Sequence, residues 1–199
     1  MHTNPPSSEI SWSIEDALEF ARAAHATVRN SDGSVGQVRK FTGEPYVEHP
    51  IEVSNLVAKS ARCTKVMIAA ALLHDVAEDT SVTLSDIEKR FGPEVRELVE
   101  CLTNPPHIEG ESRADRKAAA RQRLEQAPWQ AQTIKCADIR SNAQSIAFHD
   151  PKFAKVWIPE KLKEIAAMSK ADPELRDLAR KTCLDALASI ETKHDKPRG

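Results

Sequence analysis

One apolar segment is followed by four residues whose types and spacing could do chemistry. His74 and Asp75 end the run KVMIAAALLHD, and Glu78 and Asp79 follow within a turn. An imidazole next to a carboxylate can bind one metal ion, and this pair suits Mn, Fe or Zn better than Mg or Ca. If the helix continues, Glu78 lies one turn beyond His74 and Asp79 one turn beyond Asp75. Two acids beside a metal could orient water or transfer protons during a hydrolysis.

The alternative interpretation of this segment is a helix end with solvated acids. Acidic side chains are disfavoured at a helix C-terminus, because the helix dipole places its negative end there. A cluster of three carboxylates at that position therefore calls for a compensating cation. A metal ion would supply that charge.

A second segment, RKFTGEPYVEHP at residues 39–50, contains basic residues and a further histidine. Pro50 suits the first turn of a helix, so His49 stands at a helix start and could project inward as another ligand. Arg39 and Lys40 precede it on a loop. These two cations could hold phosphates or stack on a base.

A third segment, IKCADIRSN at residues 134–142, places Lys135, Asp138 and Asn142 on one face of a helix at i, i+3 and i+7. A lone aspartate is usually a surface carboxylate. Here Asp138 lies among apolar residues, and a buried charge needs a partner. The segment is therefore a candidate to complete a site begun by the other two.

Helices must position these three segments, because the sequence predicts an all-α fold of about eight or nine helices. Capping patterns at Ser13 and Thr83, and Thr64 before the apolar run, mark three helix starts. The expected helices cover about 14–29, 49–59, 65–75, 84–91, 93–102, 112–126, 128–149, 159–170 and 173–192. The expected domain covers 13–192, with tails at 1–12 and 193–199, a loop over 30–47 and a mobile stretch over 104–112.

Composition excludes several classes of protein. The chain has 199 residues, six glycines and a formal net charge of −2, which argue against an all-β sandwich and against a coat protein for nucleic acid. The longest apolar run is too short to span a bilayer, and the N-terminus lacks a secretory pattern. Four scattered cysteines fit a reducing compartment. We expect a cytoplasmic protein with no nucleic-acid or membrane partner, and an oligomer is possible but not derivable.

Taken together and in this order, the three segments resemble those of the HD-domain hydrolases of the RelA/SpoT homologue superfamily. More narrowly, the chain is similar to the small alarmone hydrolases over about residues 14–190. The resemblance implies a single HD-domain helical bundle. It also implies Mn²⁺-dependent removal of the 3′-diphosphate of the guanosine alarmones (p)ppGpp, which yields GDP or GTP and pyrophosphate.

The resemblance also assigns roles to residues. It implies that one Mn²⁺ is held by His49, His74, Asp75 and Asp138. The acidic pair Glu78 and Asp79 matches the residues that shape the catalytic water and the leaving-group chemistry. The residues implied to contact the nucleotide are Arg39, Lys40, Tyr46, Lys117 and Asn142.

Departures from the family pattern leave alternatives open. The chain carries an insert, residues 26–35, just before the loop expected to hold the base. The same site could therefore act on another nucleotide, such as (p)ppApp or the 2′-phosphate of NADPH. A catalytically silent alarmone-binding protein is a third possibility, against which the intact acidic pair argues. The basic cluster over 113–123 is either a solvated helix face or a contact to the distal phosphates.

Overall fold

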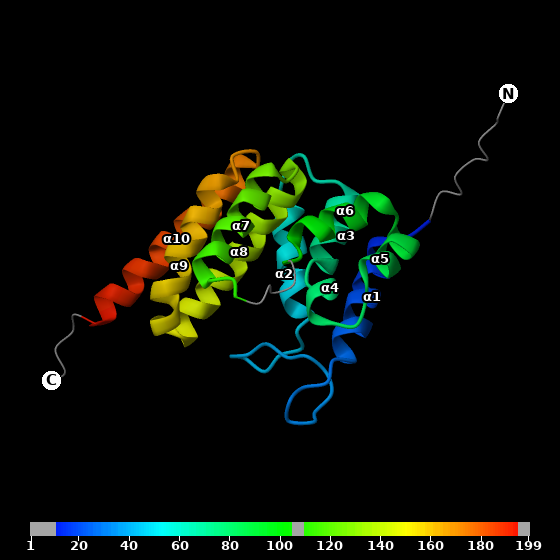
Figure 1. Cartoon of the computed structure of the whole chain (residues 1–199), viewed down its shortest axis with the longest axis horizontal. Helices are drawn as coiled ribbons and strands as arrows, with labels where there is room; N and C mark the ends of the chain where they lie inside the picture. The colour runs from blue at the N-terminus through cyan, green and yellow to red at the C-terminus, as the bar shows by residue number, and fades with distance from the viewer. Residues whose placement is uncertain (1–10, 105–109, 195–199) are drawn as a thin grey trace.

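The computed structural model describes residues 11–104 and 110–194 (Figure 1). In this part of the chain, nine helices have eight residues or more, one has a single turn, and two isolated β-bridges replace any strand. The helices are α1 (Ile14–Ala26), α2 (Glu48–Val57), α3 (Lys65–Leu73), α4 (Val76–Asp79), α5 (Leu84–Phe91), α6 (Pro93–Leu102), α7 (Arg113–Gln126), α8 (Trp129–His149), α9 (Pro151–Ala167) and α10 (Pro173–His194). The predicted all-α fold is confirmed.

Local capping explains where several helices begin. Ser13 and Asp16 form a reciprocal capping box at the start of α1, and Thr83 and Asp86 form a second one at the start of α5. The Thr64 hydroxyl accepts a hydrogen bond from the Met67 amide at 3.3 Å, which caps α3. These three helix starts lie where the sequence predicts them.

Two helices, α1 and α9, differ most from the predicted boundaries. α1 ends at Ala26 rather than near residue 29, with Thr27 as its C-cap. α9 begins at Pro151, eight residues before the predicted start at Pro159, because the Asp150 carboxylate caps it by accepting from the Phe153 amide. Pro159, which was predicted to start this helix, lies inside it. Because proline has no backbone N–H, the helix lacks one backbone hydrogen bond there.

The centre of the molecule is formed by α2, α3 and α8. α3 contacts α1, α2, α6 and α8, and its alanines 69–71 are fully buried, so neighbouring helices approach it closely. α8 lies between two apolar clusters: Ala131 and Ile134 pack with the N-terminal helices, while Ile139 and Ala143 pack with α9 and α10. The candidate segments therefore come from the three innermost helices.

The insert between α1 and α2 forms a loop whose two ends are joined by backbone hydrogen bonds. The Gly36 amide donates to the Val28 carbonyl at 2.8 Å, and the Gln37 amide donates to the His25 carbonyl at 2.9 Å. In Figure 1 this loop projects from the lower edge of the bundle. The chain returns to the end of α1 before the 39–50 segment begins, so the insert does not displace that segment.

Three expectations fall partly outside the described residues. These are the N-terminal tail up to residue 10, the middle of the stretch predicted to be mobile (105–109), and the end of the C-terminal tail (195–199). Among the described helices, none is long and apolar enough to cross a membrane.

Candidate metal centre and adjoining pocket

Four side chains predicted as metal ligands meet where α2, α3 and α8 come together. His49 lies in the first turn of α2, His74 caps the C-terminus of α3, Asp75 follows it, and Asp138 lies in the middle of α8. His49 Nε2 is 3.2 Å from Asp138 Oδ1 and 3.8 Å from Asp75 Oδ2. His74 Nε2 is 3.1 Å from Asp75 Oδ2 and 3.9 Å from Asp138 Oδ1. The two imidazoles and two carboxylates thus surround one point.

The donor set fits a divalent transition metal. Ligand atoms of His49, His74 and Asp138 all lie within 4.8 Å of one another, and all three side chains are buried. Ligand atoms bound at about 2.0–2.2 Å to one ion lie within about 4.4 Å of each other, so a small inward movement completes coordination. Nitrogen and carboxylate donors together favour Mn, Fe or Zn. The site therefore suits a divalent metal.

His74 gives the clearest sign that this site takes a cation. Its Nδ1 lies 2.8 Å from the Ala71 carbonyl oxygen, to which it donates, whereas its buried Nε2 has no hydrogen-bond partner and faces the carboxylates. Burial by itself lowers the pKa of His74, but the neighbouring Asp75 carboxylate outweighs it and raises that pKa to about 9. The negative electrostatic potential beside His74 Nε2 thus favours a bound positive charge.

Asp138 is held by its own helix. Lys135 Nζ lies 2.8 Å from Asp138 Oδ2, and Asn142 Nδ2 donates to Asp138 Oδ1 at 2.7 Å. Burial would raise the pKa of Asp138, but the Lys135 ammonium lowers it well below its usual range. The i, i+3, i+7 spacing of Lys135, Asp138 and Asn142 read from the sequence thus fixes a buried carboxylate in its charged form.

Tyr46 donates its phenolic hydrogen to Asp75 Oδ2 at 2.6 Å. Burial and the adjacent Asp75 carboxylate both raise the pKa of Tyr46, so the phenol keeps its proton. Tyr46 was predicted to contact the nucleotide. In the structure its hydroxyl orients a carboxylate of the metal site.

The acidic pair Glu78 and Asp79 does not continue the helix of His74. α3 ends at Leu73 and the chain resumes as the single turn α4, in which the Asp79 amide donates to the Asp75 carbonyl at 2.9 Å. Glu78 accepts hydrogen bonds from the backbone and side-chain amides of Asn104, both at 3.1 Å. Asp79 Oδ2 instead accepts from Gln37 Nε2 at 2.8 Å. Asp79 thus lies one turn beyond Asp75, and the two carboxylates have separate partners.

Gln37 in turn lies 2.7 Å from His25, through Gln37 Oε1 and His25 Nδ1. Burial raises the pKa of Asp79, while the hydrogen bond from Gln37 opposes that shift. A carboxyl group with a raised pKa suits proton transfer near neutral pH. His25 is buried behind the site, and the sequence alone gave no sign of the role of Gln37.

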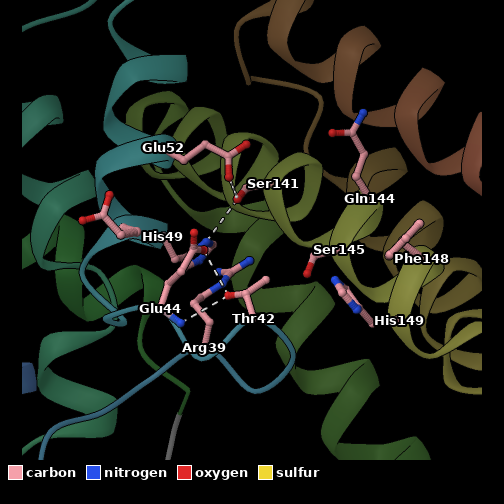
Figure 2. A pocket seen from close by; sticks show the side chains of 11 residues that line it. Arg39, Thr42, Glu44, His49, Glu52, Ser141, Gln144, Ser145, Phe148 and His149 are labelled. Carbon is pink, nitrogen blue, oxygen red and sulfur yellow. Dashed lines mark hydrogen bonds between the residues drawn. The ribbon is translucent and has the colours of Figure 1, made fainter.

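A pocket of about 360 Å³ adjoins the metal site on the side of His49. Figure 2 shows Arg39, Thr42 and Glu44 on the loop side, and Gln144, Ser145, Phe148 and His149 along α8. The Phe41 ring stacks on His149 at 5.2 Å with an interplanar angle of 5°, which joins the loop to α8. Arg39 lines this pocket. His149 lines it too, and only the tertiary contact with the loop reveals this.

The basic cluster over 113–123 is used mainly for contacts between helices. Arg113 pairs with Glu160 at 2.9 Å, and Arg123 donates to the carbonyls of Thr103 and Glu100 at 3.3 Å. Lys117 lines a smaller cavity of about 50 Å³, together with Lys135 and Lys161. Lys117 therefore lines a different cavity from the one beside His49.

Lys40 has a different environment from its neighbour Arg39. Its ammonium group lies over the Phe41 ring, 5.0 Å from the centroid, and Lys40 is absent from the residues that line the larger pocket. The structure therefore brings together the four ligand candidates with Tyr46 and Asn142. It places Arg39 and Lys117 at two different cavities and leaves Lys40 exposed, over the Phe41 ring.

Comparisons with known proteins agree with this geometry. Residues 17–190 match the HD domain family. A mouse protein named guanosine-3′,5′-bis(diphosphate) 3′-pyrophosphohydrolase MESH1 is 36% identical over 135 residues, which cover 66% of this chain and 68% of that protein. Its human counterpart is 35% identical with the same coverage. A solved structure described as a metazoan ortholog of SpoT that hydrolyses ppGpp superposes with a TM-score of 0.69 at 25% identity, covering 97% of this chain and 99% of that one.

Proposed function

Because the chain belongs to the HD domain family, we propose that it is a metal-dependent phosphohydrolase that removes the 3′-diphosphate of (p)ppGpp. The single observation that carries the proposal is the cluster of His49, His74, Asp75 and Asp138, with the unpartnered Nε2 of His74 facing the carboxylates. The names of the mouse and human relatives support the same substrate. The small nucleotide is the partner that this function requires.

The metal that we propose is one Mn²⁺ per chain, held by these four residues. A mixed imidazole and carboxylate site suits this ion. When bound, a divalent ion lowers the pKa of a water molecule and offsets charge on phosphoryl oxygens. Lys135 and Asn142 keep Asp138 charged and oriented, and Tyr46 does the same for Asp75.

Hydrolysis requires that the bond between the 3′ oxygen and phosphorus breaks. The water oxygen joins the released pyrophosphate, and a proton goes to the 3′ oxygen. We assign the proton transfers to Glu78 and Asp79, since Asn104 and Gln37 hold the two carboxylates in separate places beside the ligands. Asp79, with its raised pKa, is suited to accept a proton and return it.

The two cavities fit the two ends of such a substrate. A nucleoside suits the pocket of about 360 Å³, where Arg39 is available for phosphate or base. Lys117 lies at the smaller cavity, where a cation can contact distal phosphates. Lys40 and Asn142 complete the proposed contacts, Lys40 as an exposed cation on the loop and Asn142 beside Asp138.

The alternative of a different nucleotide rested on the insert, and the structure weakens that reason. Residues 26–35 close on themselves and do not line the pocket.

The four free cysteines support the expectation of a cytoplasmic protein.

The test is a substrate panel of ppGpp, ppApp and NADPH, run with Mn²⁺ and with chelator. We expect GDP and pyrophosphate from ppGpp with Mn²⁺, and none with chelator or with the Asp75→Ala variant. The absence of turnover above that variant would refute the proposal. A higher kcat/KM for ppApp or NADPH would replace the substrate. If Glu78→Ala abolishes turnover while ppGpp binding survives, a binding-only role is excluded.

A further inference from the structure

Behind His49 lies a chain of polar side chains that ends at an exposed carboxylate. His49 Nδ1 is 3.1 Å from Ser141 Oγ, and Ser141 Oγ donates to Glu52 Oε2 at 2.6 Å. Arg140 Nη1 donates to Glu52 Oε1 at 2.7 Å. Figure 2 shows Glu52, Ser141 and His49 in line at the wall of the larger pocket.

The donors and acceptors in this chain set the direction of its hydrogen bonds. A carboxylate accepts hydrogen bonds and has none to donate, so the Ser141 hydroxyl must give its hydrogen to Glu52. The Ser141 oxygen then accepts from His49, which requires a hydrogen on Nδ1. Without metal, His49 Nε2 lies 3.2 Å from Asp138 Oδ1, and with Nδ1 engaged it is the ring nitrogen left to bind an ion.

We propose that Glu52, acting through the Ser141 hydroxyl, is a positioning residue that fixes the tautomer and ring orientation of His49 for metal binding. Arg140 holds one carboxylate oxygen and so presents the other to Ser141. His49 is 2% and Ser141 is 3% exposed, so a solvent molecule has little access to replace the hydroxyl. The inference rests on the metal site of the proposed function.

The two histidines of the site are therefore fixed by different means. His74 donates to the backbone carbonyl of Ala71, an acceptor that no side-chain substitution removes. His49 depends on side chains, and Glu52, the last acceptor, is 43% exposed on the pocket wall. Partners of this kind typically change metal affinity by about 10- to 100-fold when removed. Metal affinity is thus set at Glu52 as well as at the ligands.

The experiment measures Mn²⁺ affinity and, in the metal-free protein, the protonation of the His49 ring by ¹⁵N NMR. We expect Ser141→Ala and Glu52→Ala each to raise the Mn²⁺ dissociation constant by about 10- to 100-fold. Nδ1 of the His49 ring, which carries a hydrogen in the wild type, loses it in part in both variants. Ser141→Thr keeps the hydroxyl, so the Mn²⁺ dissociation constant and the hydrogen on His49 Nδ1 should both stay as in the wild type. The double variant binds Mn²⁺ no more weakly than Ser141→Ala, since the two residues act in series.

Glu48→Ala is the matched control, because Glu48 lines the same pocket one turn before Glu52 but lies outside the hydrogen-bonded chain. The inference is overturned if Ser141→Ala leaves the dissociation constant within twofold of the wild type, if Nδ1 of His49 keeps its hydrogen in that variant, or if Glu48→Ala weakens binding as much as Glu52→Ala. A protein that binds Mn²⁺ as described but leaves ppGpp intact refutes the proposed function and supports the inference.

Discussion

Removing the buried cation Lys135 should destabilise the metal-free protein far more than removing a surface cation. Lys135 Nζ lies 2.8 Å from Asp138 Oδ2, and the two side chains are only 17% and 10% exposed. Lys135→Met keeps the length of the side chain but leaves the Asp138 carboxylate buried without its cation. Breaking such a pair from one side costs about 3–5 kcal/mol, largely because the remaining charge is uncompensated.

The loss should fall near the lower end of that range. Asp138 Oδ1 keeps the hydrogen bond from Asn142 at 2.7 Å and lies 3.2 Å from His49 Nε2. We therefore expect about 3 kcal/mol, which for a chain of this length lowers Tm by about 6–12 °C. Because a bound divalent ion places positive charge beside the same carboxylate, Mn²⁺ should recover part of the loss.

The assay is urea unfolding with EDTA and then with Mn²⁺, with Lys181→Met as the matched control. Lys181 pairs with Asp185 at 2.6 Å, but the side chains are 73% and 63% exposed, so this pair should contribute less than about 1 kcal/mol. The double variant Lys135→Met/Asp138→Asn should be more stable than Lys135→Met, since it no longer buries an unpaired charge. A loss below about 1 kcal/mol in EDTA, or a double variant less stable than Lys135→Met, would refute the reasoning.

Three further outcomes are expected. Gln37→Leu removes the hydrogen bond that opposes the raised pKa of Asp79, so the pKa of Asp79 should rise further. In the pH–rate profile, kcat should then fall at a higher pH on the acid side than in the wild type. An unchanged acid side of the profile would contradict the role of Asp79. Replacing residues 28–35 with two glycines should change the free energy of unfolding by less than about 1 kcal/mol and leave Mn²⁺ affinity intact, because the loop closes on itself; loss of metal binding would show otherwise. Mn²⁺ at 100 times its dissociation constant should stabilise the wild type by about 2.7 kcal/mol, a Tm increase of about 5–11 °C by calorimetry, and Asp138→Asn should abolish the increase.

Several parts of the fold were predictable because their causes are local. The capping boxes at Ser13 and Thr83 fix helix starts through contacts three residues apart, and these lie where expected. The start of α9 was predicted wrongly, since Asp150 caps it earlier and Pro159 is tolerated inside the helix. A proline marks a helix start only when no stronger cap precedes it.

The site shows the same division between local and long-range causes. The pairing of Lys135, Asp138 and Asn142 follows from helical spacing and is confirmed in the structure. Spacing also placed Asp79 one turn beyond Asp75, and the Asp79 amide donates to the Asp75 carbonyl at 2.9 Å. It did not reveal the partners of the two acids, Asn104 and Gln37, which lie 26 and 42 residues away in sequence.

By itself, then, the sequence determined the helical class, the caps and the residue types that suit a metal, because these depend on propensity and on contacts within one turn. Only the tertiary structure decided that Ser141 and Glu52 stand behind His49, that Gln37 holds Asp79, and that His149 meets Phe41 at the pocket. Each of these contacts joins side chains on different elements. Their partners are set by how α2, α3 and α8 pack around the buried alanines of α3, which no spacing along the chain encodes.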